Sequence, residues 1–414
     1  MVQVFQRGAA GVSPGRLRRW LAAPPAPVVL AACAAVLGLR RPDAWTNPQF
    51  WAEDSFYYSS ALLTGGRAFL ENRGGYLNTL MRAVAALAGR LDPAVAPAIF
   101  VAAGTLGTLL VCGLTLSPRC PLPKYGGLCA LAIVLVPEAH EVLLNLVNVQ
   151  WVLGAGLILI LLSADPTTPG ARAFDLAAAA VIGLTGPFCI LLLPGFAVRA
   201  WQRRSRASLV LLAAVAACAA VQLLELRTYG ASLYAKQGAQ VHAELFLPVI
   251  GRRVFGSLFM GVLLSPDTDI VISTVVALAG LGGFAYLALG PGERRGIRAM
   301  LGLAFLLLLG GALYRGRDLL TLFFTPETRA RYVYIPQLVV LWLMLTAAAQ
   351  KGRPQRWCAA LLAWGLLVNL PRLREPAFID FHWREYADRI RSGDPVVIPV
   401  NPNGWLLELP ARGK

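Results

Sequence analysis

The most constraining feature of this chain is a series of apolar segments, many long enough to cross a membrane, separated by short loops rich in arginine. A helix needs about 20 apolar residues to cross a bilayer, with a range near 17–25. Lipid offers no hydrogen bonds to the backbone, so segments that cross it are helical. We therefore predict an all-α polytopic membrane protein with about eleven transmembrane helices. The predicted spans are residues 25–40, 95–116, 125–137, 149–163, 172–185, 187–199, 207–226, 268–289, 298–314, 333–349 and 357–370.

The composition favours a membrane protein and argues against a nucleic-acid partner. Of the 414 residues, 57% are hydrophobic and 14% are charged, whereas soluble domains carry about 25% charged residues. A net charge of +16 would suggest nucleic acid in a soluble protein, but here the arginines lie between apolar segments. The seven cysteines lie almost all inside apolar segments. We expect them to be core residues, with no disulfide framework or zinc site.

The distribution of lysine and arginine predicts the orientation. Short loops on one side carry most of the basic residues and only two acids, Asp165 and Glu293. By the positive-inside rule these loops and the N-terminus are cytoplasmic, and an odd number of spans puts the C-terminus in the periplasm. The first apolar segment is then an uncleaved span rather than a signal peptide. The basic loops are residues 117–124, 164–172, 199–206, 291–298 and 351–356.

The loops on the opposite side are longer and carry most of the acids. Residues 77–91 predict an amphipathic helix in the outer interface, with Arg82 and Arg90 off its apolar face. Residues 251–264 are too short to span, and Ser265-Pro266-Asp267 ends them, so they predict a second interfacial or re-entrant element. These external loops would cover one end of the bundle.

The chain divides into a transmembrane domain, residues 1–370, and a small periplasmic cap, residues 371–414. The sequence of the cap predicts a short helix ending near Arg391, a strand at 396–400 and a turn at 401–405. The weakest boundary in the bundle lies at Thr185-Gly186-Pro187. That sequence is compatible with two short segments, one kinked helix or a re-entrant pair.

The first external loop, residues 41–94, joins many aromatic residues to one adjacent acidic pair, Glu53 and Asp54. A carboxylate held at the membrane surface by aromatic side chains is the best candidate for chemistry in this chain. The alternative is that the two acids only begin a surface helix, where acids are favoured in the first turn. On a helix the two side chains point about 100° apart, so they cannot serve one acceptor equally.

Four polar residues recur at helical spacing after Pro137. The positions i, i+3, i+7 and i+10 would place them on one face of a helix. A polar stripe in an apolar bundle favours a substrate cavity. The alternative is a helix end in water, with its asparagines bonded to neighbouring loops. The candidate cavity residues are Glu138, Glu141, Asn145 and Asn148, with His140 beside them.

A basic cluster lies on the external side. Arginine there runs against the positive-inside rule, so it carries more information than the cytoplasmic arginines. Guanidinium groups beside tyrosines suit a phosphate or pyrophosphate at the membrane surface. The alternative is that these arginines snorkel or pair with Asp318 and Glu327. The cluster comprises Arg315, Arg317, Arg329, Arg331 and Tyr332.

Acids and arginines would thus share one membrane face above an apolar bundle, which suits a lipid-borne phosphate donor. The arginines would hold the phosphate leaving group, the bundle would take the polyprenyl chain, and a carboxylate would deprotonate the acceptor hydroxyl. A divalent cation, Mg²⁺ or Mn²⁺, could be held by the acids of the external loops. The acids concerned are Glu53, Asp54, Glu138 and Glu141. The residues identify no metal, and His140 and His242 do not make a metal site.

This layout resembles the GT-C superfamily of integral-membrane glycosyltransferases, which use polyprenyl-phosphate sugars. The resemblance rests on the loop after the first span, because GT-C enzymes carry their catalytic acid there. It covers most of the chain in layout and little in strict motif, and the short tail departs from members with large periplasmic domains. The supporting sequences are Phe50-Trp-Ala-Glu-Asp-Ser-Phe-Tyr, Gly75-Tyr76-Leu77, Pro137-Glu138 with Glu141, Asn148-Val-Gln-Trp151, Thr185-Gly-Pro187-Phe and the ending from Ile398 to Trp405.

By this resemblance Asp54, or else Glu53, would be the catalytic base. Arg331 would bind the donor phosphate, with Arg329, Arg315 and Tyr332 around it. The fold would be GT-C-like, and the protein would lie in a bacterial inner membrane. It would move one sugar from undecaprenyl- or decaprenyl-phosphate, with inversion, to a glycan, lipid or protein on the outer face.

A polyprenyl-phosphate-sugar synthase and a flippase would supply the donor. Two other classes of protein stay open at this point. A lipid-linked sugar flippase or transporter would place its essential charges near the bilayer midplane. A non-catalytic envelope-assembly subunit would tolerate replacement of Glu53, Asp54 and Arg331.

Overall fold

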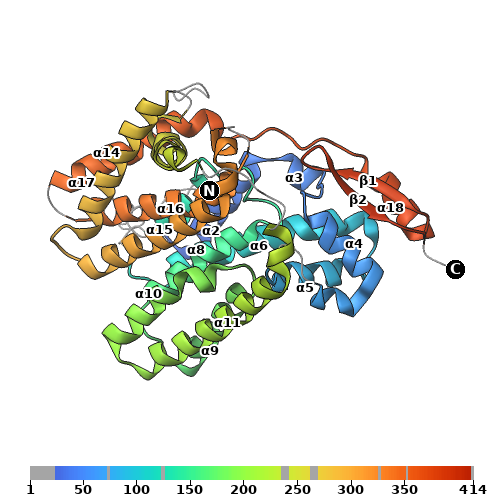
Figure 1. The fold of residues 1–414 in the computed structure, drawn as a ribbon, viewed down its shortest axis with the longest axis horizontal. Coiled ribbons are helices and arrows are strands. Elements are labelled where there is room, and N and C mark those ends of the chain that lie inside the picture. The colour runs from blue at the N-terminus through green and yellow to red at the C-terminus, as the bar shows by residue number, and fades with distance from the viewer. Residues whose placement is uncertain are drawn as a thin grey trace, which may run out of the picture.

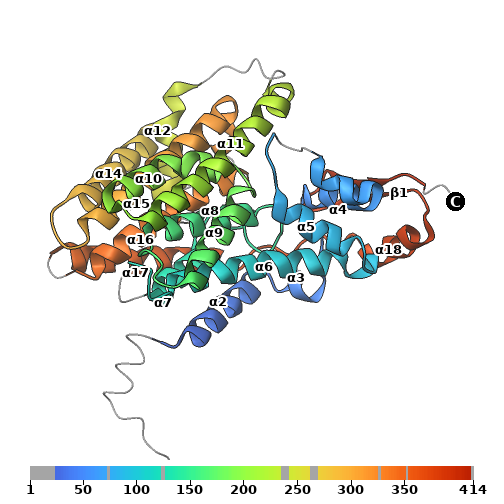
Figure 2. The ribbon, with the colours of Figure 1, turned by 90° about the horizontal axis from the view of Figure 1, so that it is seen from below.

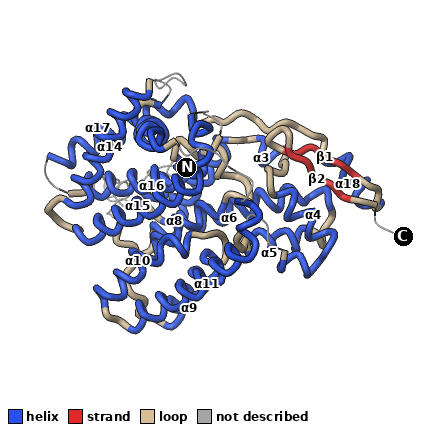
Figure 3. The backbone as a smooth tube through the Cα atoms, in the orientation of Figure 1, coloured by secondary structure: helices blue, strands red, loops and turns tan. Residues whose placement is uncertain are grey.

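The computed structural model describes residues 24–71, 75–122, 126–234, 242–261, 269–324, 328–350 and 353–411. Within these ranges the chain is mainly helical, with one two-stranded sheet near the C-terminal end (Figures 1 and 3). The predicted helical class is confirmed. The predictions for residues 1–23, Lys124, Ser265-Pro266-Asp267, Glu327 and Lys351 concern positions outside the described residues.

Every predicted span contains a helix. Five of the described helices are long and apolar enough to cross a membrane, and they lie at α6, α11, α14, α15 and α16. Others, such as α2, α7 and α8, are apolar but shorter, so the total number of spans stays a prediction. The helices are α2 Ala26–Arg40, α6 Ala96–Thr115, α7 Gly126–Leu135, α8 Val149–Leu162, α9 Pro169–Gly183, α10 Phe188–Arg203, α11 Arg206–Tyr234, α14 Ile270–Leu289, α15 Arg295–Gly316, α16 Ala330–Ala348 and α17 Arg353–Asn369.

Short helix α7 ends inside the protein, and its last carbonyls are bonded by side chains from its neighbours. A helix leaves its final carbonyl groups without intrahelical partners. Arg40, at the end of α2, donates to the Val134 carbonyl at 3.1 Å, and the Tyr334 hydroxyl of α16 donates to the Ile133 carbonyl at 2.8 Å. These bonds allow a polar helix end to lie between α2 and α16.

The predicted cytoplasmic loops meet at one end of the bundle. Arg119 donates to the Ala164 carbonyl at 3.2 Å, and Arg294 donates to the Pro121 carbonyl at 3.1 Å. Arg203 reaches Asp165, at 2.8 Å. These contacts join four of the five basic loops across long sequence separations. We call this the basic end.

The predicted external loops meet at the opposite end. The first of them contains α3 Asp43–Thr46, α4 Asp54–Thr64, the 3₁₀ turn η1 Gly65–Leu70 and α5 Thr79–Ala88. The Thr79 amide donates to the Leu184 carbonyl at 3.0 Å, which joins this loop to the turn between α9 and α10. That turn separates two distinct helices, so the sequence around Thr185 does not form one kinked helix. Further 3₁₀ turns are η2 Pro93–Val95, η3 Ala243–Leu245, η6 Arg317–Phe324 and η7 Leu370–Arg372.

Helix α5 is confirmed, but its buried face differs from the prediction. Arg82 is only 3% exposed, whereas Leu87 is 55% exposed. The Arg82 guanidinium donates to the carbonyls of Phe69 and Glu71, which end the preceding turn. The apolar pattern could not reveal that these two carbonyls take an arginine as their donor.

The described part of the segment predicted at 251–264 is helical and packs against other helices. Its described part runs through α12 Phe246–Val249, the π-helix η4 Ile250–Gly256 and α13 Ser257–Phe259, and it is mostly buried. At Gly251 an added Cβ would lie 1.7 Å from the Ser273 carbonyl oxygen of α14. Only glycine allows so close an approach. The element is therefore packed against α14, and whether it is interfacial or re-entrant stays a prediction.

The cap consists of α18 Trp383–Ser392 and the antiparallel strands β1 Val396–Val400 and β2 Trp405–Leu409. The helix and first strand were expected, and the second strand was missed. The cap packs on the first external loop, where the Asn401 amide donates to the Phe50 carbonyl at 3.2 Å. Both views show it beside α4, at the end opposite the turn between α14 and α15 (Figures 1 and 2). All seven cysteines are free, and all but Cys120 are buried, as expected.

Candidate functional site

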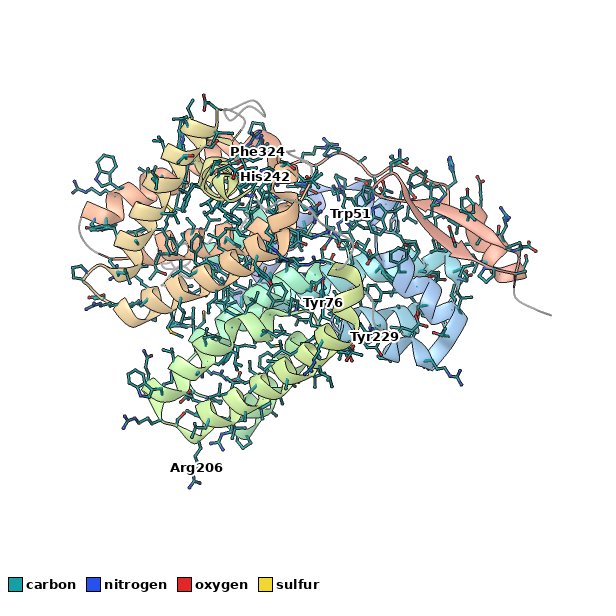
Figure 4. All side chains as sticks on the ribbon, viewed as in Figure 1. Trp51, Tyr76, Arg206, Tyr229, His242 and Phe324 are labelled. Carbon is teal, nitrogen blue, oxygen red and sulfur yellow. The ribbon has the colours of Figure 1, made fainter. Side chains whose placement is uncertain are left out.

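A cavity of about 940 Å³ lies where the first external loop meets the bundle. Two of its lining residues, Tyr76 and Tyr229, are labelled in Figure 4. Its polar wall includes Glu53, Tyr57, Glu71, Tyr76, Asn78, Asn148, Gln150, Arg315, Arg317 and Arg331. Its apolar wall includes Ile190, Leu191, Leu223, Leu226, Leu308, Ala312 and Ile335. The cavity is thus polar beside the external loops and apolar between α10, α11 and α15.

The two adjacent acids have different surroundings. Glu53 lines the cavity, and its buried Oε2 atom has no hydrogen-bond partner among the described residues. Asp54 is 1% exposed and does not line the cavity. Its Oδ1 atom accepts from the Val147 amide at 2.8 Å. Of the pair, Glu53 is the carboxylate that a ligand in the cavity could reach, which reverses the order expected from the sequence.

Burial sets the protonation of Asp54. Desolvation raises the pKa of its carboxyl group to about 8, and the backbone amides of Val147 and Trp51 oppose that rise. Below that pH the group is mainly neutral, and a neutral carboxyl is a poor general base. Asp54 is suited to joining α4 to the buried loop before α8.

The predicted polar stripe is not a helix. Helix α7 ends at Leu135 and α8 begins at Val149, and between them Leu144 has a left-handed backbone with φ of 62°. The side-chain amides of Asn145 and Asn148 both donate to the Glu141 carbonyl, at 2.8 and 2.7 Å. Asparagine side chains compete with helical hydrogen bonds in this way. The segment is a buried loop held by its own side chains.

Most of the stripe lies outside the cavity. Asn148 lines it, whereas Glu138, His140, Glu141 and Asn145 do not. Hydrogen bonds from the asparagine side chains fix the shape of this loop. Helical spacing therefore did not predict which of its polar residues line the cavity.

Glu138 and Glu141 stabilise neighbouring elements instead. Glu138 forms a buried ion pair with Arg253 of the π-helix at 2.9 Å and accepts from Ser257 at 3.0 Å. Glu141 accepts from the backbone amide of Arg331 at 3.2 Å, at the first turn of α16. A carboxylate is favourable at a helix N-terminus. These acids fix the walls behind the cavity.

The arginine cluster is brought largely into the cavity. Arg315, Arg331 and Tyr332 line it together with Arg317, whereas Arg329 does not. The Arg331 guanidinium lies 5.6 Å from the centre of the Tyr332 ring. No carboxylate of the described residues lies within ion-pair distance of that guanidinium. Arg331 is therefore available to an anion in the cavity.

Several lining residues were not predicted as site residues. Asn78 donates through its side chain to the Tyr57 hydroxyl, and both line the cavity. Trp405 of the cap lines it too, with its ring 5.5 Å from that of Phe56. Clusters of aromatic and amide residues in the loop sequences were the available signal. Trp405 lines the cavity because the C-terminal cap packs on the first external loop.

The acids considered for a divalent cation do not gather into a metal site. Across the part of the chain that the structure describes, no group of three or more His, Cys, Asp or Glu residues could hold a metal ion. Asp54, Glu138 and Glu141 are each bonded to different protein groups. We therefore derive no step through a metal.

A scan against protein-family models, a search of curated proteins and a search of solved structures each found no significant match to this chain.

Proposed function

We propose that this protein is an integral-membrane glycosyltransferase of GT-C type that uses a polyprenyl-phosphate sugar. The observation that carries the proposal is the composition of the one large cavity described above. Three arginines line one part of it together with Glu53, whose Oε2 atom has no hydrogen-bond partner among the described residues, and leucines from three helices line the other part. A ligand that is both anionic and long-chained fits such a cavity.

The chemistry follows from the lining residues. Arg331, with Arg315 and Arg317, would bind the donor phosphate, and the polyprenyl chain would lie along the apolar wall. Glu53 would accept the proton of an acceptor hydroxyl as its oxygen attacks the anomeric carbon. The bond from that carbon to the phosphate oxygen breaks, and the polyprenyl phosphate leaves with the electron pair, inverting the anomeric centre. The arginines stabilise the charge that develops on the phosphate.

The position of the charges favours a transferase over a transporter. The charged lining residues all belong to the external loops and to the ends of α15 and α16 that adjoin them. A transporter is expected to hold its coupling charges near the bilayer midplane.

We place the basic end in the cytoplasm and the cavity and cap on the periplasmic side of a bacterial inner membrane. Arg206 at the basic end and Glu385 of the cap are both exposed, and Figure 4 shows Arg206 pointing away from the bundle. In intact cells an impermeant thiol reagent should label Glu385→Cys, and Arg206→Cys only after lysis. The reverse pattern would overturn this orientation.

The decisive test is sugar transfer by the purified protein in detergent, with radiolabelled polyprenyl-phosphate sugars and a membrane extract as acceptor. General-base catalysis is worth about 10²–10⁴-fold, so Glu53→Gln should lose at least about a hundredfold in turnover while donor binding persists. The matched control is Glu385→Gln, on the exposed face of the cap. Near-normal turnover by Glu53→Gln would exclude Glu53 as the base. Donor movement across vesicles without transfer would favour the flippase alternative.

A further inference from the structure

The turn between α10 and α11, at the basic end, is fixed by one carboxylate. Asp165 accepts from the guanidinium groups of Arg199 and Arg203, both at 2.8 Å, and from the hydroxyls of Ser205 and Ser208, at 2.5 and 3.0 Å. The Ser205 hydroxyl also accepts from the Ser208 amide at 3.0 Å, which caps the start of α11. A carboxylate offers about four acceptor positions. Asp165 therefore has no capacity left for other arginines of the turn.

Two arginines of this turn, Arg204 and Arg206, are exposed and bonded to nothing in the protein. Neither guanidinium forms an ion pair or a hydrogen bond with the described residues. Figure 4 shows Arg206 pointing away from the bundle. Ser205 lies between the two and is held by Asp165, so both guanidinium groups extend from a fixed backbone. Two cationic groups on one fixed turn, with no acid free to pair with them, form a surface suited to an anion.

The backbone at Arg204 favours a role for its side chain other than folding. The residue has a left-handed conformation, with φ of 51° and ψ of 25°, at the C-terminal end of α10. Glycine adopts this conformation readily at helix ends, whereas any residue with a Cβ atom costs free energy there. Residues held in such conformations cluster at functional positions. A guanidinium that bonds no protein group does nothing to offset that cost.

The neighbouring residues place these arginines at the level of lipid headgroups. Helix α11 is long and apolar enough to cross a membrane. Trp201 of α10 and Leu209 and Val210 of α11 are exposed. Each lies three or four residues further into its helix than the nearer arginine, which is about 4.5–6 Å deeper. Tryptophan favours the membrane interface, and leucine and valine favour the hydrocarbon region. The two guanidinium groups therefore lie just outside that interface, where lipid phosphates are found.

We infer that Arg204 and Arg206 bind the phosphate groups of anionic phospholipids in the leaflet at the basic end. A guanidinium bonds a phosphate through two N–H groups at once. A zwitterionic phospholipid carries its own cation beside the phosphate, which weakens the attraction, whereas phosphatidylglycerol does not. Basic residues at a membrane surface attract anionic lipids for this reason. The inference is independent of the proposed function, because it involves no residue of the cavity.

The test measures which phospholipids stay bound to the purified full-length protein. The protein is incubated in detergent with equal amounts of phosphatidylglycerol and phosphatidylcholine and purified again, and the bound lipids are quantified by mass spectrometry. The wild type should be enriched in phosphatidylglycerol. Replacing both arginines with glutamine should lower this enrichment about fivefold for each charge removed. Raising the NaCl concentration from about 0.05 M to about 0.5 M should lower it in the wild type, because salt screens exposed charges.

Arg204→Gly separates lipid binding from folding. Glycine suits the left-handed backbone, so this variant should melt at the wild-type temperature or above it and still lose about fivefold of the enrichment. The matched control is the double variant Arg384→Gln and Arg389→Gln, which removes the same charge from exposed positions on α18 of the cap. The control should keep the wild-type enrichment. Equal retention of the two lipids by the wild type would overturn the inference, and so would an equal loss of enrichment in the control.

Discussion

Both ends of the bundle are rich in arginine, but the arginines have different surroundings. At the basic end Arg199 pairs with Asp165 at 2.8 Å, and Arg119 pairs with Asp175 at 2.6 Å. At the cavity end Arg331 has no carboxylate within ion-pair distance among the described residues, although it lines the cavity of about 940 Å³. The comparison teaches that arginine content alone does not mark a site. An arginine that lines a cavity without an ion-pair partner among the described residues, such as Arg331, is a better indication of a binding site.

The energetic consequences of the two arrangements also differ. Arg199 is 2% exposed and also donates to the Leu161 carbonyl at 3.1 Å, so its charge is compensated by protein groups. Removing one partner of a buried pair leaves the other uncompensated, which is strongly destabilising. An unpaired guanidinium at a cavity keeps its hydrogen-bonding capacity for a ligand. Substitutions at the two ends should therefore affect different measurements.

The largest effect is expected at the basic end. Arg199→Ala removes one of the donors to Asp165 and the side-chain donor to two backbone carbonyls, so it should lower the free energy of unfolding by about 2–4 kcal/mol. Because the Asp165 side chain is partly exposed, the loss of unfolding free energy should lie near the lower limit of this range. Thermal unfolding in detergent measures it, with the exposed Arg206→Ala as control. A stability equal to that of the control would show that the paired end is not held together by its charges.

The next largest effect is expected at the cavity, on the affinity for polyprenyl phosphate. Arg331→Lys keeps the charge but loses the planar two-pronged donor geometry, so polyprenyl-phosphate affinity should fall about tenfold. Arg331→Ala should lower it further, and neither variant should lose much thermal stability. The same exchange at the basic end, Arg119→Lys, should leave affinity unchanged. Full affinity in both Arg331 variants would mean that this arginine only anchors the helix at the interface.

The sequence predicted the positions of the helices well, because apolar run length and arginine spacing are local properties. It also singled out Arg315, Arg331 and Tyr332, which line the cavity, because arginines outside the expected basic loops stand out. The segment 138–148 was mispredicted as a helix for a physical reason. Its asparagine side chains bond the Glu141 carbonyl, and an α-helix would have used the backbone for that purpose. Periodicity does not detect that competition.

The rest of the site depends on contacts between distant segments. Whether Glu53 or Asp54 faces the cavity depends on the Val147 amide, which is far away in the sequence. Trp405 enters the cavity wall because the Asn401 amide bonds the Phe50 carbonyl. Neither contact leaves a periodic signal.

The smallest effect on activity is expected for Asp54, because its carboxyl group is bonded to the protein, whereas Glu53 lines the cavity. The pKa of Asp54 is raised to about 8 by burial, above its ordinary value near 3.8. The folded state therefore binds this proton more tightly than the unfolded chain. Its contribution to stability is complete at low pH and is lost as pH rises through about 8.

Asp54→Asn keeps an oxygen that can accept from the Val147 amide and removes the titration. Between about pH 5 and about pH 9, the melting temperature of this variant should therefore fall less than that of the wild type. The difference should be roughly 2–4 °C for each kcal/mol of pH-dependent stability that the wild type loses. Sugar transfer should stay within a few-fold of normal, because Glu53 is intact. If Asp54→Asn abolishes transfer at unchanged stability, the acid buried against the loop is the base after all. In that case the proposed difference between Asp54, bonded to the protein, and Glu53, available to a ligand, would be wrong.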